Sequence, residues 1–247
     1  MYKFFIEANQ IQENVVRIIG EDVNHISNVL RLKLNDNIII CNKNTCKSYM
    51  AEIDGFTKEQ IECKIVNEIE ESTESNVNID LFQGLPKADK MENIIQKATE
   101  IGVRNIFPVQ MERCIVKIDK KAESKKIERW QKIAEVAAKQ SKRDWIPRIE
   151  NLINIENICK STQKYDIILI AYENENGNTL KNELKKLDRN KKLTIGVVVG
   201  PEGGITEEEV KQLESAGGKS VTLGKRILRT ETAPIVLLSD IVYEFEL

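Results

Sequence analysis

The sequence is poor in the residues from which metal centres and disulfide frameworks are built. It has one histidine, His25, and an odd number of cysteines with no Cys-x-x-Cys pair. A zinc ribbon, a histidine-rich metal centre and a disulfide scaffold are therefore not indicated, and a serine–histidine hydrolase would depend on His25 alone. We expect no bound metal, and we expect reduced, structural thiols at the five cysteines. These are Cys41, Cys46, Cys63, Cys114 and Cys159.

Other absences exclude further classes of protein. No apolar run approaches the roughly 20 residues that a membrane-spanning helix needs, and the N-terminus lacks the apolar core of a secretory signal, so we expect a cytoplasmic protein and no membrane partner. Gly218-Lys219-Ser220 resembles the end of a phosphate-binding loop, but Leu213 stands where that motif needs glycine. No Gly-x-Gly-x-x-Gly follows an expected strand either. A nucleotide triphosphatase and a common dinucleotide-binding fold are both unsupported.

The charge of the chain is unevenly distributed. The net charge is -2, yet residues 117–148 hold 11 Lys or Arg against 5 Asp or Glu, interleaved with Trp130 and Trp145. This segment is a candidate surface for a phosphate backbone. The alternative is a solvated helix face, which charge alone does not exclude.

The first part of the chain has the pattern of a small β-rich module. A helix-like stretch over residues 22–31 precedes strand-like runs over 38–41, 49–53 and 61–66, separated by polar turns. Short strands with polar turns suggest a compact barrel. The polar stretch 68–76 has no apolar period. We therefore expect one domain over residues 1–71 and a second over 72–247.

The second part alternates strands with helices. The expected strands cover residues 77–81, 106–109, 166–172 and 193–199, and the expected helices cover 91–101, 120–142 and 233–245. A further helix, capped by Thr206 and Glu209, is expected between the strand 193–199 and the helix 233–245. Gly102 ends the first of these helices. The apolar runs 166–172 and 193–199 are typical of strands buried on both faces of a parallel sheet. The sequence thus predicts an α/β domain.

Two loops of this domain are candidates for chemistry. Residues 199–204, Val-Gly-Pro-Glu-Gly-Gly, leave a buried strand just before a capped helix, which is where an open α/β sheet binds ligands. Residues 223–233 hold two arginines, a lysine and a glutamate between the short strand 220–223 and the last helix. Such crowding favours a functional loop. An ordinary tight turn and a charged surface turn are the respective alternatives.

Taken in order, several segments resemble one family, the 16S ribosomal RNA uracil-N3 methyltransferases of the SPOUT (knotted) superfamily. The matching stretches are 25–31 (HISNVLR), Lys90-Met91 with 95–103 (IQKATEIGV), 112–114 (ERC), 139–143 (KQSKR) with Pro147, 200–204 (GPEGG) and 223–233 (LGKRILRTETA). Separated matches in one order are more specific than any single match. Lys3 stands where family members usually have arginine, which keeps the charge but loses the planar bidentate fork.

The resemblance implies an N-terminal barrel similar to the PUA RNA-binding domain and a C-terminal parallel-sheet domain with a deep trefoil knot. It also implies a homodimer, the cofactor S-adenosyl-L-methionine, and 16S ribosomal RNA in the small subunit as the partner. The residues implied to bind the cofactor are Leu169, Ala171, Tyr172, Glu173, Val199, Gly200, Pro201, Glu202, Gly203, Leu223, Gly224, Ile227, Leu228, Arg229, Thr232 and Ala233.

Two residues are candidates for the chemistry of methyl transfer to uracil N3. The guanidinium of Arg229 stays protonated and could stabilise an anionic base. Glu231 could act as a general base, pair with Arg229, or sit favourably at the start of a helix. The expected RNA contacts are Lys3, Arg31, Arg113, Lys139, Lys142 and Arg143. A knotted methyltransferase acting on a ribose 2′-oxygen or another base, and a non-catalytic RNA-binding assembly protein, are the alternative functions.

Overall fold

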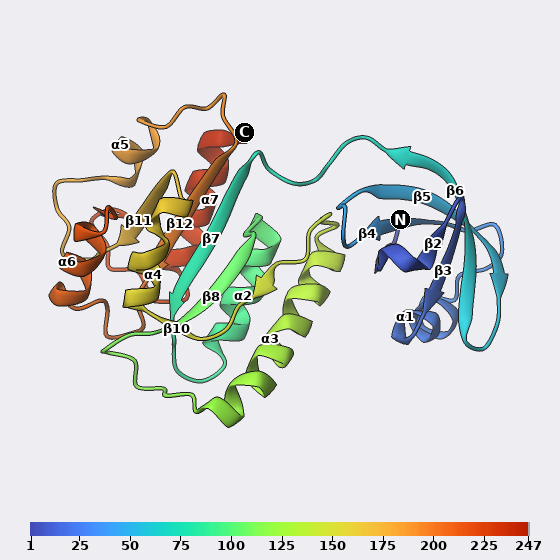
Figure 1. Ribbon diagram of the computed structural model, residues 1–247, viewed down its shortest axis with the longest axis horizontal. Coiled ribbons are helices and arrows are strands. Elements are labelled where there is room, and N and C mark those ends of the chain that lie inside the picture. Colours follow the sequence, from blue (N-terminus) through green and yellow to red (C-terminus); the bar gives the residue numbers. More distant parts are fainter. Residues whose placement is uncertain (247) are drawn as a thin grey trace. The chain divides into compact units, whose positions relative to one another are not determined.

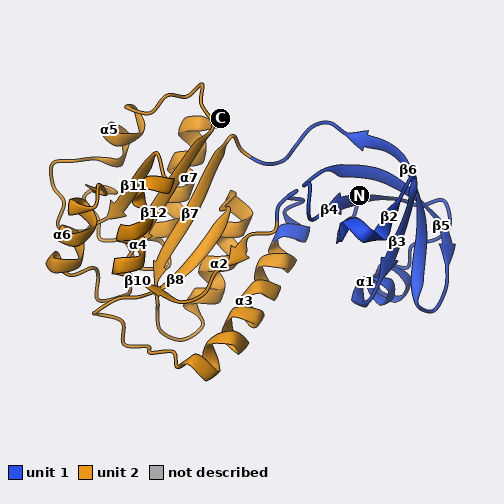
Figure 2. Cartoon of the chain, viewed as in Figure 1, with its two compact units in different colours: residues 1–74, 138–145 blue, residues 75–137, 146–247 orange. Residues whose placement is uncertain are grey.

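A computed structural model describes residues 1–246, which form two compact units (Figure 2). Unit 1 comprises Met1–Glu74 with Ala138–Trp145, and unit 2 comprises Ser75–Ala137 and the chain from Ile146 onward. The division after Glu74 lies close to the expected boundary after residue 71. The assignment of 138–145 to unit 1 has no counterpart in the sequence pattern.

Unit 1 is built on a curled six-stranded sheet (Figure 1). In spatial order its strands are β1 (Lys3–Ile6), β4 (Asn37–Asn42), β5 (Ser48–Phe56), β6 (Gln60–Ile69), β3 (Val15–Ile19) and β2 (Ile11–Gln12). The β1–β4 pair is parallel and the other pairs are antiparallel. The three strands expected from the pattern, β4, β5 and β6, are confirmed, while β1, β2 and β3 are additional. One face of the sheet is apolar, so Phe4, Val16 and Ile18 are buried in a core of their own.

The helix expected over residues 22–31 is shorter and less regular than predicted. It consists of α1 (Glu21–Asn24) followed by a π-helical turn, η2 (His25–Val29). The Leu30 N–H bonds to the His25 carbonyl oxygen at 2.9 Å. Arg31 then takes a left-handed φ of 55°, which stops the helix. A short 3-10 helix, η1 (Ala8–Gln10), precedes these elements.

The segment 138–145 is held in unit 1 by buried polar contacts. The ammonium of Lys3 lies 2.6 Å from the Asp144 carboxylate, and both side chains are almost wholly buried. Asp144 also accepts hydrogen bonds from the Ser48 hydroxyl and from the backbone and hydroxyl of Thr73. Although burial by itself would raise the pKa of Asp144, these donors hold it below its ordinary value. The carboxylate is therefore charged in the folded protein.

Unit 2 is an α/β unit around a parallel sheet, as the sequence predicts. In spatial order its strands are β10 (Ile153–Asn154), β8 (Asn105–Gln110), β7 (Val77–Gly84), β12 (Leu193–Val199), β11 (Ile167–Ala171) and β13 (Lys219–Val221), with β9 (Arg148–Ile149) also paired to β8. Every pairing is parallel. Their carboxyl ends therefore meet at one edge of the sheet.

The helices of unit 2 are α2 (Lys90–Ile101), α3 (Lys120–Gln140), α4 (Ile155–Ser161), α5 (Leu180–Leu184), α6 (Glu207–Ser215) and α7 (Ala233–Phe245), with the 3-10 turn η3 (Thr162–Lys164). The last three residues of α3 belong to unit 1. Helix α7 packs against α2 and over β7 and β12 (Figure 1). Two predicted helix ends are confirmed, since Gly102 ends α2 with a φ of 123° and Thr206 with Glu209 forms the capping box of α6.

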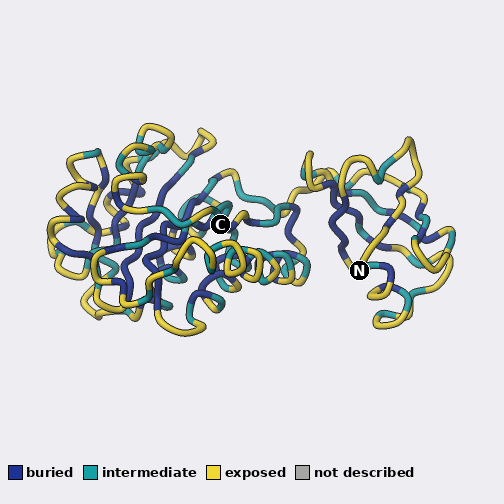
Figure 3. Tube along the Cα trace, turned by 60° about the horizontal axis from the view of Figure 1, so that its bottom comes forward, coloured by how far each residue is buried: buried dark blue, intermediate teal, exposed yellow. Residues whose placement is uncertain are grey.

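The central strands of unit 2 carry its core. Ile195, Val197 and Val198 of β12 are fully buried. In Figure 3, most of the central part of this unit is coloured as buried. All five cysteines are free thiols, as expected, and burial raises the pKa of Cys41 and Cys63 to about 12. No helix among the described residues is both long enough and apolar enough to cross a membrane.

Candidate active site

A cavity of about 390 Å³ opens at the carboxyl edge of the unit 2 sheet. Its walls come from the ends of β11 and β12 and from the two loops singled out in the sequence, so the structure brings those loops together. The lining residues are Lys90, Ala171, Tyr172, Glu173, Glu175, Asn176, Val199, Gly200, Pro201, Glu202, Gly204, Thr222, Leu223, Gly224, Lys225, Arg226, Ile227, Leu228, Arg229, Thr230 and Ala233. This edge is where parallel α/β sheets bind ligands.

Two glycines let backbone segments approach closely around the cavity. At Gly84, the end of β7, an added Cβ would lie 2.6 Å from Cδ of Pro201, so the exits of β7 and β12 can touch only without a side chain there. Gly204 has a φ of +72°, and the carboxylate of Glu173 occupies the place of its missing Cβ. The cavity wall at Glu173 therefore depends on glycine at position 204.

A buried amide joins three chain segments beneath the cavity. Gln83 is fully buried, and its Nε2 donates to the carbonyl oxygen of Gly84 at 2.9 Å and to the Thr230 hydroxyl oxygen at 3.1 Å. That hydroxyl donates in turn to the Gly200 carbonyl oxygen at 2.7 Å. The ends of β7 and β12 and the loop before α7 are thereby tied together.

A charged cluster joins the same segments nearer the surface. The ammonium of Lys90, the first residue of α2, lies 3.0 Å from the Glu202 carboxylate and 3.2 Å from that of Glu231. The Glu202 carboxylate also accepts the backbone N–H of Lys87. The hydrogen bond to Glu202 raises the pKa of Lys90. Burial alone would raise the pKa of Glu202, but its backbone and Lys90 donors lower it. Lys90 and Glu202 are therefore held in their charged forms, and Lys90 also orients the Glu231 carboxylate.

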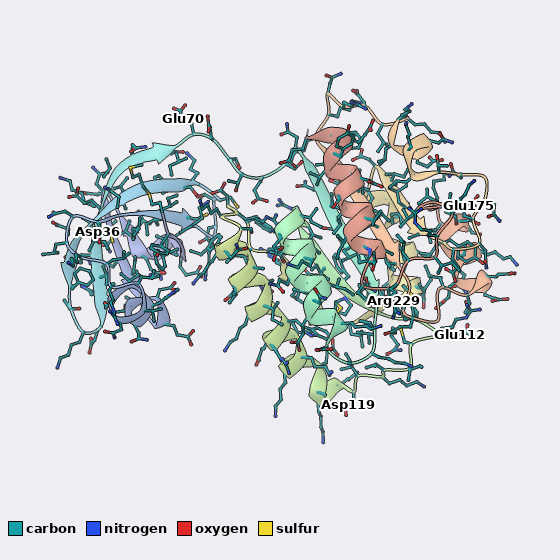
Figure 4. The ribbon with its side chains drawn as sticks, turned by 180° about the vertical axis from the view of Figure 1, so that it is seen from behind. Asp36, Glu70, Glu112, Asp119, Glu175 and Arg229 are labelled. Carbon is teal, nitrogen blue, oxygen red and sulfur yellow. The ribbon has the colours of Figure 1, made fainter. Side chains whose placement is uncertain are left out.

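The loop 223–232 brings cations to the mouth of the cavity. Lys225, Arg226 and Arg229 are exposed and line the cavity. Figure 4 shows Arg229 beside the beginning of α7. The Arg229 carbonyl oxygen accepts the N–H groups of Thr232 and Ala233, so the backbone of the loop is fixed to the start of α7 while the guanidinium is free to meet a ligand.

The structure places the predicted cofactor residues mostly in this cavity. The exceptions are Leu169, which is fully buried in β11, Gly203, whose carbonyl oxygen accepts Nη1 of Arg113 at 2.8 Å, and Thr232, the N-cap of α7. Of the two predicted catalytic residues, Arg229 lines the cavity. Glu231 does not line it, but its carboxylate pairs with Lys90, which does. Whether these residues bind the cofactor stays a prediction.

Several lining residues were not among the predicted cofactor or catalytic residues, although five of them lie in the loops or motifs singled out in the sequence. They are Lys90, Glu175, Asn176, Gly204, Thr222, Lys225, Arg226 and Thr230, with Gln83 beneath them. Lys90 carried one usable signal, because it follows a strand whose carboxyl end meets those of β11 and β12. Nothing in the local sequence indicated that it would bridge two distant glutamates.

The predicted RNA contacts fall into two groups. Lys3 is paired with Asp144, and Arg143 is buried and bonded to Glu74 at 2.5 Å. Lys139 lies 2.8 Å from Asp22. The second group is exposed and comprises Arg31, Arg113 and Lys142. The charged atoms of Lys3 and Arg143 are engaged inside unit 1, and contact of the exposed group with RNA stays a prediction.

A second hollow of about 810 Å³ lies between α2 and α3. It is open, and charged side chains dominate its walls, with Arg129 lying 2.7 Å from Glu92 across it. No strand end contributes to its walls, so we place the chemistry in the smaller cavity. Among residues 1–246, no cluster of three metal-ligating side chains is found.

Comparison with known families decides what this architecture is. An RNA methyltransferase domain model matches residues 73–242, and an RNA methyltransferase PUA domain model matches residues 18–66. The chain belongs to this RNA methyltransferase family. The cavity thus lies in the methyltransferase domain, at the sheet edge formed by its strand ends.

Individual members of the family match along their whole length. Ribosomal RNA small subunit methyltransferase E of Bacillus subtilis is 39% identical over 100% of this chain and 98% of its own, and that of Mesomycoplasma hyopneumoniae is 34% identical over 98% and 99%. A crystal structure of ribosomal RNA small subunit methyltransferase E from Neisseria gonorrhoeae, bound to S-adenosyl methionine, is 34% identical with a TM-score of 0.85, covering 98% of this chain and 97% of that one.

Proposed function

We propose that this RNA methyltransferase uses S-adenosyl-L-methionine to methylate N3 of a uridine in 16S ribosomal RNA of the small subunit. The observation that carries the proposal is the cavity at the carboxyl edge of the unit 2 sheet, where loops 199–204 and 223–233 meet and Arg229 lies at the mouth. Relatives similar over their full length are named for small subunit ribosomal RNA methylation, which supports the substrate class. The resemblance stated above supplies the finer assignment to uracil N3.

The residues of the cavity fit the proposed cofactor. A volume of about 390 Å³ lies within the range of small-molecule sites. Val199, Leu223 and Leu228 offer apolar surface for an adenine ring, and the glycine-containing loops expose backbone groups for hydrogen bonds. When bound, S-adenosyl-L-methionine supplies an electrophilic methyl group, and the electron pair of the broken carbon–sulfur bond stays on sulfur.

The protein must also stabilise the negative charge that develops on the uracil. N3 gives up its proton to water before or as it forms the new N–C bond, so negative charge develops on the base during transfer. We propose that the guanidinium of Arg229, at the mouth of the cavity, stabilises that charge. The Glu231 carboxylate is held by Lys90 at 3.2 Å, which favours an orienting role for it over that of a free general base. N3 is normally used in base pairing, so the nucleotide must be unpaired or flipped out.

The finer features of the fold belong to the same proposal. The loop after β13 returns to the end of β12, where Thr230 bonds to Gly200, and this return is consistent with the deep trefoil knot of the SPOUT superfamily. We propose that unit 1 is a PUA-like RNA-binding barrel, that the chain acts as a homodimer, and that it works in the cytoplasm with its ribosomal substrate. Arg31, Arg113 and Lys142 are the exposed residues proposed to contact RNA.

Methyl transfer to small ribosomal subunits that lack the modification tests this function. Labelled S-adenosyl-L-methionine is the donor, and the RNA is digested and its nucleosides are identified. The expected product is 3-methyluridine. A ribose 2′-O-methyl product or another methylated base would reassign the chain to a different RNA position. Absence of cofactor binding in calorimetry would instead indicate a non-catalytic RNA-binding protein.

A further inference from the structure

The tip of loop 223–232 exposes an apolar side chain among cations. Ile227 is 85% exposed, more than any other large apolar residue that the structure describes. Lys225 and Arg226 precede it and are also exposed, and Arg229 follows two positions later. All four line the mouth of the cavity. An isoleucine held in water in this setting indicates a surface that is covered when a ligand binds.

The cations of this tip are not held in ion pairs. Within residues 1–246, no salt bridge joins Lys225, Arg226 or Arg229 to a carboxylate. Lys90 differs, because it lies between Glu202 and Glu231 on the inner side of the same cavity. The cations at the rim therefore attract a polyanion, whereas Lys90 inside the cavity is already engaged by two carboxylates.

The loop is anchored at its base and projects at its tip. Thr230 is buried and bonded to Gly200, which fixes the end of the loop nearest α7. At the other end, Gly224 has a φ of +114° and nothing within 4 Å of the position of an added Cβ. The Thr222 hydroxyl donates to the Gly224 carbonyl oxygen at 3.2 Å. Residues 225–227 are thus presented by a fixed stem.

We propose that Ile227 packs against the face of an RNA base next to the target nucleotide and keeps that nucleotide unstacked above the cavity, while Lys225 and Arg226 bind the flanking phosphates. The inference rests on the proposed function and adds the element that presents the substrate. An RNA strand satisfies both observations, since it offers apolar base faces between regularly spaced phosphates. Apolar wedges flanked by cations open nucleic-acid stacks in this way.

Substitution of Ile227 tests the wedge in the full-length protein. Ile227→Ala is expected to lower kcat/KM for small ribosomal subunits about tenfold, as when a contact that offsets base unstacking is lost, and Ile227→Leu is expected to retain most of the activity. Ile227 is among the residues predicted to bind the cofactor, but its side chain is 85% exposed, so we expect the affinity for S-adenosyl-L-methionine in calorimetry to change little in either variant. Ile115→Ala is the matched control, because Ile115 is 71% exposed and does not line the cavity.

Each other outcome overturns the inference in a distinct way. Weaker cofactor binding by Ile227→Ala would mean that the side chain covers the cofactor. A change in oligomeric state, measured by light scattering, would mean that a second copy of the chain covers it. An unchanged kcat/KM would remove any role in substrate presentation. If the unaltered protein transfers no methyl group to small subunits, the proposed function itself fails, whatever Ile227 does.

The cations are tested by the salt dependence of RNA binding. Lys225→Ala and Arg226→Ala are each expected to reduce the slope of log affinity against log salt by about 0.7, the value for one single-strand phosphate contact. Lys192→Ala is the control, because Lys192 is exposed and directly precedes β12, at the end of the strand opposite the cavity. An unchanged slope in both loop variants would contradict phosphate binding by the tip.

Discussion

Gly204 occupies a position where two constraints coincide. Its φ is left-handed, and the Glu173 carboxylate fills the space in which a side chain would begin. Gly204→Ala is therefore expected to cost about 1–2 kcal/mol in backbone strain and to displace Glu173 from the cavity wall. Denaturant titration should show the loss of stability, and calorimetry should show weaker binding of S-adenosyl-L-methionine.

Gly217 provides the matched control for this substitution. It also has a positive φ, of +104°, but nothing lies within 4 Å of an added Cβ. Gly217→Ala should thus carry a similar strain and leave cofactor affinity as it was. If Gly204→Ala and Gly217→Ala bind the cofactor equally well, the Glu173 wall has no part in the site.

At the scale of elements, the carboxyl ends of β7 and β12 depend on the hydroxyl of Thr230. Thr230→Val removes the donor to Gly200 and the acceptor for Gln83, so the Gly200 carbonyl oxygen keeps only the longer 3.4 Å hydrogen bond from Gln83 Nε2. The expected cost is about 1–3 kcal/mol in the free energy of unfolding. Chemical denaturation measures it, and weaker cofactor binding should accompany it.

Thr230→Ser distinguishes the contribution of the hydroxyl group from that of the methyl group, because serine keeps only the hydroxyl. Serine keeps both hydrogen bonds, so its stability and cofactor affinity should remain close to those of the unaltered protein. A loss in the serine variant as large as in the valine variant would show that packing of the methyl group, rather than the hydrogen-bond network, holds these strand ends.

The elements predicted from the sequence are those in which apolar residues follow a regular pattern of burial. Strand β12 is buried on both faces and is an unbroken apolar run, so its type and position were evident. Strand β1 escaped notice because a buried lysine, Lys3, stands in it. In β3 only Val16 and Ile18 are buried, but exposed apolar residues alternate with them and hide the period.

The candidate site was foreseen only as far as strand ends determine it. Parallel strands place loops 199–204 and 223–233 at one edge, so their meeting followed from the fold class. The Lys90 cluster depends on pairing between distant segments, which no local pattern records. The sequence also does not show which cations are exposed. Arg143 belongs to the basic segment 117–148, but in the structure it is buried against Glu74.

At the scale of the whole molecule, unit 1 depends on a buried ion pair supplied from far along the chain. The lowered pKa of Asp144 means that its stabilisation is complete above the ordinary aspartate pKa of about 3.9 and is lost as the pH falls through the lowered value. Asp144→Asn leaves Lys3 buried without its counter-ion. We expect it to cost about 3–5 kcal/mol at pH 7 and progressively less in acid, as measured by denaturant titration at several pH values.

Glu62→Gln is the control for this prediction. Glu62 pairs with Arg17 on the surface of unit 1, where both side chains are more than 40% exposed. Its loss should change stability by less than about 1 kcal/mol. A difference between the Asp144→Asn and unaltered proteins that stays constant from neutral to acidic pH would contradict the assignment to a charged carboxylate.

Unit 1 is built from two separate stretches of sequence, and this limits how it can be exchanged between proteins. A fragment that stops at residue 74 contains all six strands but lacks Asp144, so Lys3 would stay inside it with no carboxylate beside it. A chimera that takes unit 1 from a relative must therefore import both stretches, one of which continues directly from helix α3. Recombination at a single junction would separate the lysine from the aspartate, so unit 1 cannot be inherited as a simple N-terminal segment.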